Sequence, residues 1–188
     1  MVICVATDKD TARIIRKYIG AFFERIPAFA RMVQRSTEDL IELSNSVDIA
    51  IAAGNFRSVR GRPILTAILD EIAFFRSEES STPDTELYRA LLPGMRLPTS
   101  RMIGISSPYK KAGLLYTRHR TRFGKDSDDV MVLRAASHVM KPDLDTADRD
   151  RMMAEDPAAG RAEYYAEFRD DLVILIDPAT VSPPSATV

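Results

Sequence analysis

The spacing of apolar residues divides the chain into alternating strand-like and helix-like segments. Val2 to Ala6 form a short apolar run typical of a strand, after which Thr7 or Asp8 can cap a helix. In that helix large apolar residues recur at helical spacing on one face, namely Ile14, Ile15, Tyr18, Ile19, Phe22 and Phe23. The sequence therefore begins with a strand that leads into an amphipathic helix.

The period of the pattern changes to two after Leu40. Apolar and polar residues alternate on either side of the turn-forming pair Asn45-Ser46, which predicts a β-hairpin over residues 40–51. A continuous apolar run, Ile64 to Leu69, then ends in the acidic pair Asp70-Glu71. Such a run is typical of a central parallel strand that is covered on both faces.

The rest of the pattern continues the alternation of helices and strands. We expect helices around residues 85–92, 112–122, 144–155 and 158–168, and strands at 102–105 and 130–133. This order favours an α/β fold with a mostly parallel sheet flanked by helices. Ligands of such sheets bind at the carboxyl ends of the strands. Asp70, Glu71, Ser106 and Ser107 all follow predicted strands, so we expect them at one edge of the sheet.

Composition narrows the class of protein. The chain has 188 residues, with 45% hydrophobic and 28% charged residues, which suits one soluble domain with a core. Its net charge of -1 provides no overall basic field for nucleic acid, and its single cysteine, Cys4, excludes a disulfide within the chain. No apolar stretch approaches the roughly 20 residues that span a bilayer. We therefore expect a cytoplasmic protein with no membrane partner.

The domain boundary is placed near the C-terminus. Residues 1–176 are expected to form one partial domain. The segment 177–188 is rich in proline and serine, so we expect a linker or a disordered tail there.

The acidic pair has the form that phosphoryl transfer requires. That chemistry needs a metal ion to neutralise phosphate charge and a group that orients the attacking water. At the end of a rigid buried strand, Asp70 would hold Mg²⁺ through water, and Glu71 would polarise the nucleophilic water. The alternative is a strand end that carries two solvated acids.

Two further segments could contribute to the same chemistry. Arg57, Arg60 and Arg62 precede the acidic strand, and a loop arginine can stabilise transition-state charge on a neighbouring subunit's nucleotide. Ser106 and Ser107 could sense a γ-phosphate through a hydroxyl. The alternatives are surface charge for the arginines and a Ser-Pro turn for the serines.

Other polar residues carry less information. His119 and His138 lack partners at metal-ligand spacing, so exposed or structural roles are expected. Asp126, Asp128 and Asp129 lack the glycine and the distal glutamate of a calcium loop.

An ordered set of motifs resembles the large subunit of phage terminases. The motifs are Ser58-Val59-Arg60-Gly61, Ile68-Leu69-Asp70-Glu71-Ile72-Ala73-Phe74-Phe75, Ile105-Ser106-Ser107-Pro108-Tyr109 and Ala162-Glu163-Tyr164-Tyr165-Ala166-Glu167-Phe168. The stretch Phe123-Gly124-Lys125-Asp126 and the helix entry Asp156-Pro157-Ala158 are also similar to that family. The similarity extends from Val2 to about Asp177.

The resemblance implies a fold and a set of roles. The fold is that of the additional-strand, RecA-like class of P-loop NTPases. Asp70-Glu71 resemble the Walker B pair, with Glu71 as the catalytic glutamate, and Ser106-Ser107 resemble the motif that couples nucleotide state to DNA movement. Arg60 resembles the arginine that some members offer in trans, and Arg57 is near enough to replace it.

The family also implies cofactors and partners. Intact members use ATP and Mg²⁺, and they act with double-stranded DNA, a portal ring and a small terminase subunit. A homo-oligomer is possible on the same ground. Each of these is an expectation for this chain.

The sequence departs from the family at two places. The phosphate-binding loop Gly-x-x-x-x-Gly-Lys-Ser/Thr does not occur in these residues, and the one Gly-Lys pair, Gly124-Lys125, is followed by Asp126. In the family that loop lies upstream of the strand with which this chain begins, so we expect an N-terminally truncated core. The acid cluster of the nuclease half is not found either, and Asp177 belongs to a connecting segment or begins that half.

Two hypotheses follow for the function. The chain is part of a large terminase subunit that is weak or inactive alone, or it is a non-catalytic prophage remnant with an interaction or regulatory role. A helicase is disfavoured by the motif at Ser106 and by that at residues 162–168. Whether the chain is an enzyme stays open, as does the choice between a truncated gene, a wrong start codon and a split subunit.

Overall fold

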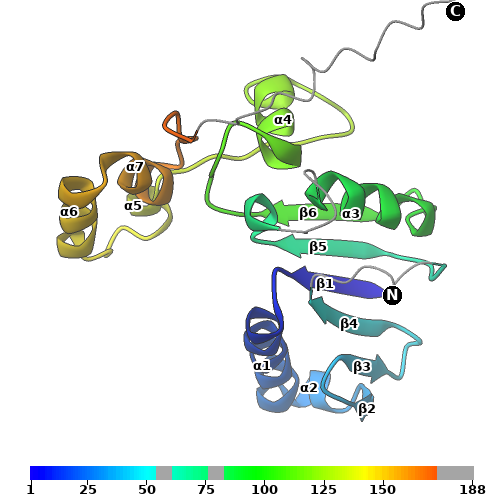
Figure 1. The fold of residues 1–188 in the computed structure, drawn as a ribbon. Helices are drawn as coiled ribbons and strands as arrows, with labels where there is room; N and C mark the ends of the chain where they lie inside the picture. The colour runs from blue at the N-terminus through cyan, green and yellow to red at the C-terminus, as the bar shows by residue number, and fades with distance from the viewer. Residues whose placement is uncertain (54–60, 76–82, 173–188) are drawn as a thin grey trace, which may run out of the picture.

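The protein is built on one mixed sheet, seen here in a computed structural model that describes residues 1–53, 61–75 and 83–172. Six strands lie in the order β2-β3-β4-β1-β5-β6 (Figure 1). Four of them are parallel, namely β1 (Val2–Ala6), β4 (Asp48–Ala53), β5 (Thr66–Asp70) and β6 (Arg101–Ile105). The mostly parallel sheet predicted from the sequence is therefore confirmed.

A hairpin closes one side of the sheet. Strand β3 (Leu40–Leu43) pairs antiparallel with β4, which confirms the predicted hairpin. The turn residue Ser46 has a φ of 62°, in the left-handed region. A further strand, β2 (Val33–Ser36), pairs with β3 and was not predicted. Its side chains are mostly exposed, so the sequence has no alternating apolar pattern there that would predict a strand.

Helices cover the sheet and extend beyond it. The longest is α1 (Lys9–Arg25), and its cap is Asp8, whose carboxylate accepts hydrogen bonds from the amides of Asp10 and Thr11 at 2.9 Å each. The others are α2 (Pro27–Ala30), α3 (Pro83–Leu91), α4 (Gly113–Arg122), α5 (Ser137–Met140), α6 (Thr146–Glu155) and α7 (Pro157–Tyr165). Two 3₁₀ turns, η2 (Ile72–Phe74) and η3 (Leu92–Gly94), follow β5 and α3. None of the described helices is long and apolar enough to cross a membrane.

The main core lies between the sheet and α3. Alternate side chains of β1 and β5 point to this face and meet two leucines of α3, and all of them are at most 1% exposed: Ile3, Val5, Ala67, Leu69, Leu87 and Leu91. This cluster buries the central strand pair on one side. On the opposite face α1 covers β4 and β1, where Cys4, Ala6 and Ile51 are buried.

The prediction of a strand at residues 130–133 is wrong. Residues 130–136 have no regular secondary structure, and Met131 and Leu133 are 81% and 82% exposed. A strand needs a neighbour for its backbone groups. Within the described part of the chain β6 pairs only with β5, so the apolar run has no partner along that edge.

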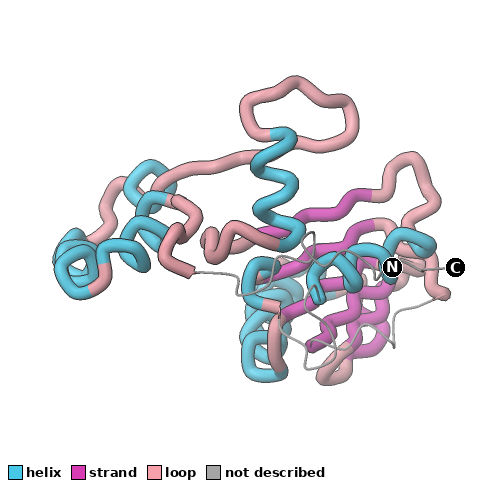
Figure 2. Tube along the Cα trace, turned by 45° about the horizontal axis from the view of Figure 1, so that its top comes forward, coloured by secondary structure: helices cyan, strands magenta, loops and turns pink. Residues whose placement is uncertain are grey.

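The helices α5, α6 and α7 form a group to one side of the sheet (Figures 1 and 2). The residues that follow α7 tie this group to the body. The amide of Arg169 donates to the carbonyl of Tyr109 at 2.8 Å, and Asp170 forms an ion pair with Lys111. The ring of Phe168 lies 5.0 Å from that of Tyr116 on α4.

His119 lies inside this junction. Its ring stacks on Phe123 at 4.8 Å and lies 5.2 Å from Phe168, and its Nε2 atom is buried without a hydrogen-bond partner in the described structure. Burial first, and then the positive charge of Arg134, lower the pKa of His119 below its usual value. His119 is therefore part of the ring packing at this junction.

We predict that the core cluster controls stability. Leu87→Ala should lower the free energy of unfolding by about 2–5 kcal/mol, because it leaves a cavity against β1 and β5. Met131→Ala should change it by less than about 0.5 kcal/mol, because that side chain is exposed. Urea denaturation followed by circular dichroism measures both values. Equal effects of the two substitutions would contradict the burial described for Leu87.

We also predict a pH dependence that comes from His119. Its pKa is lower in the folded than in the unfolded protein, so the unfolded state binds more protons as the pH falls. Stability should therefore decrease as the pH drops from about 6.5 through the lower folded pKa. In His119→Phe this loss should be smaller, and His138→Phe, which removes the exposed second histidine, is the control. Unfolding midpoints between about pH 7 and 5 test this, and an unchanged profile in His119→Phe would contradict it.

Candidate functional site

The predicted acidic pair lies where β5 ends. Asp70 is the last residue of the strand, Glu71 follows it, and both are partly buried. Glu71 has φ 53° and ψ 46°, a left-handed conformation that costs a non-glycine residue about 1–2 kcal/mol. The bend turns the chain from β5 into η2. Strained backbone of this kind concentrates at functional sites, which makes Glu71 a candidate for a catalytic group.

Ser106 meets Glu71 across the strand ends. The Ser106 hydroxyl lies 3.0 Å from Oε2 of Glu71 and 2.9 Å from the carbonyl oxygen of Ser107, and it accepts a hydrogen bond from the amide of Ala73 at 3.3 Å. A serine hydroxyl has a single hydrogen, so it donates to one of these two acceptors at a time. The expected convergence of the residues after β5 and β6 is therefore confirmed for Glu71 and Ser106.

Asp70 points to the other side of the strand end. It is in register with Ile105 and lies on the same sheet face as Cys4. Burial, and then the negative charge of Asp70, raise the pKa of the Cys4 thiol, so this cysteine stays protonated at neutral pH. Within residues 1–53, 61–75 and 83–172 the Asp70 carboxylate makes no hydrogen bond or ion pair, which leaves its oxygens available for a ligand.

The donors at this edge can be compared with what a metal ion requires. No group of three or more histidine, cysteine, aspartate or glutamate side chains gathers at metal-binding distance in the described part of the chain. Mg²⁺ usually keeps several waters and binds one or two carboxylates together with phosphate oxygens. Asp70 alone could therefore serve as the protein carboxylate of a site in which Mg²⁺ is bound through water.

The structure locates the other predicted site residues as follows. Ser107 follows Ser106, and its carbonyl is the second acceptor for the Ser106 hydroxyl. Arg57, Arg60 and Asp177 lie outside the described residues, so their proposed roles stay predictions. Arg62 is exposed near Met1, at the amino end of β5 and therefore at the opposite edge of the sheet from Glu71.

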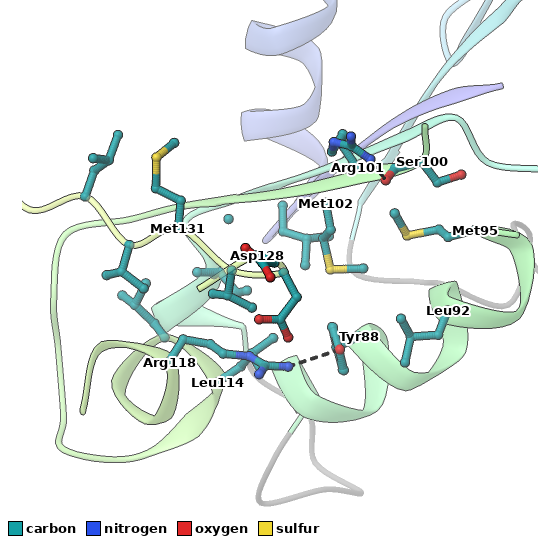
Figure 3. Close-up of a pocket in the computed structure, with 18 of the residues that line it drawn as sticks. Tyr88, Leu92, Met95, Ser100, Arg101, Met102, Leu114, Arg118, Asp128 and Met131 are labelled. Atoms are coloured by element: carbon teal, nitrogen blue, oxygen red, sulfur yellow. Dashed lines mark hydrogen bonds between the residues drawn. The ribbon is translucent and has the colours of Figure 1, made fainter. Parts of the chain in front are cut away.

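A separate cavity of about 580 Å³ lies on the α3 side of the sheet (Figure 3). Arg118 of α4 and Tyr88 of α3 point toward each other in it, with a hydrogen bond of 3.0 Å from the guanidinium to the hydroxyl. Much of the remaining lining is apolar, including Met95, Met102 and Leu114. Asp70, Glu71 and Ser106 do not line this cavity, so it is distinct from the edge with the acidic pair.

Sequence reasoning missed one residue that positions the site. Asp84 in the first turn of α3 is 7% exposed, and its carboxylate accepts hydrogen bonds from the amides of Leu114 and Thr85. It thereby holds the start of α4, shortly after Ser106. Gly113 has a φ of 84°, and a Cβ at this position would collide with the Asp84 carboxylate. In the sequence Asp84 looks like an ordinary acidic residue at the start of a helix, because Leu114, whose amide donates to it, is thirty residues away.

These features define a class of fold. A mostly parallel six-stranded sheet flanked by helices, with an acidic pair at the carboxyl end of a buried strand, is the P-loop NTPase-like α/β fold. More narrowly, the chain has the fold of the ATPase domains of phage large terminases. No protein-family model and no curated protein sequence matches the chain.

The assignment of this fold rests on the similarity of the chain to solved structures. The ATPase domain of the Thermus phage P74-26 large terminase is 18% identical with a TM-score of 0.64, over 89% of this chain and 76% of that chain. The large terminase of bacteriophage HK97 is 20% identical with a TM-score of 0.54, over 86% of this chain and 33% of that chain. The large terminase of a thermophilic bacteriophage, solved in complex with ADP, is 8% identical with a TM-score of 0.59, over 88% of this chain and 40% of that chain. The resemblance predicted from the motifs is confirmed at the level of the fold.

We predict that Ser106 stabilises the turn around Glu71. Ser106→Ala removes the hydroxyl that bonds Glu71 and the amide of Ala73, and should lower the free energy of unfolding by about 0.5–1.5 kcal/mol. The matched control is Ser107→Ala, because the Ser107 side chain makes no hydrogen bond in the described structure. Chemical denaturation measures both, and equal effects of the two variants would contradict this assignment.

Proposed function

We infer that this chain is part of a phage or prophage terminase large subunit, the ATP-driven motor that packages double-stranded DNA into procapsids. One observation supports this above the others. On a fold shared with large terminase ATPase domains, Glu71 directly follows the strand that ends in Asp70, and its carboxylate lies 3.0 Å from the Ser106 hydroxyl. Phosphoryl transfer needs a group that holds the metal ion and a group that orients the attacking water, and this carboxylate pair could supply both.

The two carboxylates take different roles in this proposal. Asp70, which has no polar partner in the described structure, would hold Mg²⁺ through water, and the bound ion would neutralise phosphate charge. Glu71 would orient and polarise the attacking water. Because the Ser106 hydroxyl bonds Glu71, it keeps this carboxylate turned toward the end of β6.

Ser106 would respond to the presence of a phosphate in the site. Its single proton can go to Glu71 or to the carbonyl of Ser107, and the two choices differ only in the rotation of the hydroxyl. A phosphate that competes for this proton would release Glu71 and shift the segment after β6. That segment continues through Tyr109 to the residues after α7, which gives the site a route to the C-terminal helices.

The isolated chain is expected to bind and hydrolyse ATP weakly or not at all. No phosphate-binding loop occurs in its 188 residues, and such a loop supplies the amides and the lysine that surround the phosphates. In the intact machine the partners would be double-stranded DNA, a portal ring, a small terminase subunit and further copies of the large subunit. Arg60, or Arg57 in its place, would act on a neighbouring copy. The location would be the cytoplasm of a bacterial host.

A second candidate function rests on the same missing loop. A chain that keeps the fold without a phosphate-binding loop could serve as a non-catalytic interaction or regulatory protein of a prophage. In this case Asp70 and Glu71 would be relics of an ancestral site.

The decisive experiment compares this chain with a longer polypeptide. The DNA upstream of the Met1 codon is sequenced, and the longest in-frame product is expressed beside the 188-residue chain. We predict little turnover by the short chain and measurable ATP hydrolysis by the longer one. Glu71→Gln in the longer product should then lower the rate by about 10²–10⁴-fold, because it removes the general base.

A matched variant controls for the loss of an acid in general. Glu155→Gln changes an exposed carboxylate on α6 and should leave turnover unchanged. Substantial hydrolysis by the short chain that is lost in Glu71→Ala would contradict the view that it lacks a working nucleotide site. No hydrolysis by the longer product would favour the non-catalytic alternative.

A further inference from the structure

The helices α3 and α4 are joined at two successive turns. Near the start of α3 the Asp84 carboxylate accepts a hydrogen bond from the amide of Leu114 on α4. One turn further along both helices, Arg118 donates to the Tyr88 hydroxyl at 3.0 Å, and its guanidinium lies 5.3 Å from the centre of the Tyr88 ring (Figure 3). Because residues four apart lie on the same side of a helix, the two contacts join one side of α3 to one side of α4.

Helix α3 is the more firmly held member of this pair. Its leucines Leu87 and Leu91 are at most 1% exposed and belong to the main core with β1 and β5. Leu114 and Leu115 of α4 pack against the same core but are only partly buried. Helix α3 therefore anchors the start of α4 to the sheet.

Asp84 replaces a side-chain cap that α4 lacks. The first amides of any helix have no partner within the helix, and Ala112, which precedes α4, provides no side-chain hydrogen bond to them. The Asp84 carboxylate takes this place from a different helix. Asp84 is 7% exposed, and a buried carboxylate is costly without partners, so the contact satisfies both groups.

Gly113 makes the close approach of Asp84 possible. Its φ of 84° is a conformation that other residues rarely adopt, and a Cβ on it would collide with the Asp84 carboxylate. Asp84 and Gly113 therefore fix both the position and the direction in which the chain enters α4. We call this contact the interlock.

The segment 106–112 connects the end of β6 to the interlock. Its first residue is Ser106, whose hydroxyl lies 3.0 Å from the Glu71 carboxylate and accepts a hydrogen bond from the amide of Ala73 at 3.3 Å. The pairing of β6 with β5 holds one end of this short segment, and the interlock holds the other.

Packing restrains the interior of the same segment. Pro108, whose ring fixes its own φ, is buried. The ring of Tyr109 lies 4.9 Å from that of Phe74 on η2, and the amide of Ala112 donates to the carbonyl of Lys110 at 2.8 Å. The two ends of the segment are therefore joined by a restrained stretch of chain.

We propose that Asp84 is a positioning residue for Glu71. By holding Gly113 and the start of α4, Asp84 fixes the far end of the segment 106–112, and this keeps the Ser106 hydroxyl in contact with Glu71. Without the Asp84 contact the segment shifts, and the Glu71 carboxylate loses its partner. As a role in catalysis the inference rests on the proposed function, but the contacts that it predicts are measured without nucleotide.

The amide of Ala73 reports the position of the Ser106 hydroxyl, to which it donates. In the 188-residue chain, Asp84→Ala should speed hydrogen exchange of this amide about tenfold or more relative to the amides of β1. The β1 amides, in the middle of the sheet, report global unfolding, so the ratio separates local release from a general loss of stability. Asp10→Ala is the matched control, because Asp10 is also the second residue of its helix but is exposed, and it should leave the ratio unchanged.

Gly113→Ala tests the interlock from the other side. With Asp84 present, the new Cβ collides with the carboxylate, so the substitution should raise the same exchange ratio and lower the thermal midpoint by about 5 °C or more. In the Asp84→Ala background the collision is removed, and Gly113→Ala should lower the midpoint by about half as much or less. Additive effects of the two substitutions would contradict the contact.

Two results would overturn the proposal. If the exchange ratio of Ala73 rises in neither Asp84→Ala nor Gly113→Ala, Asp84 stabilises α4 without positioning Ser106. If it rises equally in Tyr88→Phe, which removes only the hydroxyl of the second helix contact, the response is not specific to Asp84. None of these measurements involves ATP, so a failure of this proposal is distinguishable from a failure of the proposed function.

Discussion

The parallel pairing of β5 with β1 and β6 is the interaction on which the rest of the structure depends. It places the carboxyl ends of neighbouring strands at one edge, so that residues 35 positions apart in the sequence, Glu71 and Ser106, come within 3.0 Å. The pairing is held by one face of the strands, where Ala67 and Leu69 are fully buried against α3. A shift of β5 by one residue would exchange its two faces and separate the acidic pair from its neighbours.

The residues that follow β6 connect this edge to the C-terminal helices. Pro108 is buried, and the ring of Tyr109 lies 4.9 Å from that of Phe74 on η2. The carbonyl of Tyr109 in turn accepts the amide of Arg169, whose guanidinium lies 3.4 Å from Asp156, the cap of α7. The segment after Ser106 is therefore connected to the start of α7 through a series of direct contacts.

One end of the same sheet is less covered by helices than the rest. Burial is greatest in β1, which lies between α1 and α3, and it declines toward β6, whose side chains are mostly exposed. Asp70 lies on this less covered part of the sheet, because it shares the face of Ile68 and Ile103.

The sequence by itself determined the order and type of most elements and the convergence of the residues after β5 and β6. These features follow from local periodicity and from the geometry of parallel strands, both of which can be read along the chain. Tertiary structure decided the rest. Residues 130–133 are apolar enough for a strand, but in the described structure no strand lies beside them to accept their hydrogen bonds. Likewise α1 carries the predicted apolar face, yet half of it is exposed, because periodicity reports which residues could be buried and only the neighbouring elements decide which of them are.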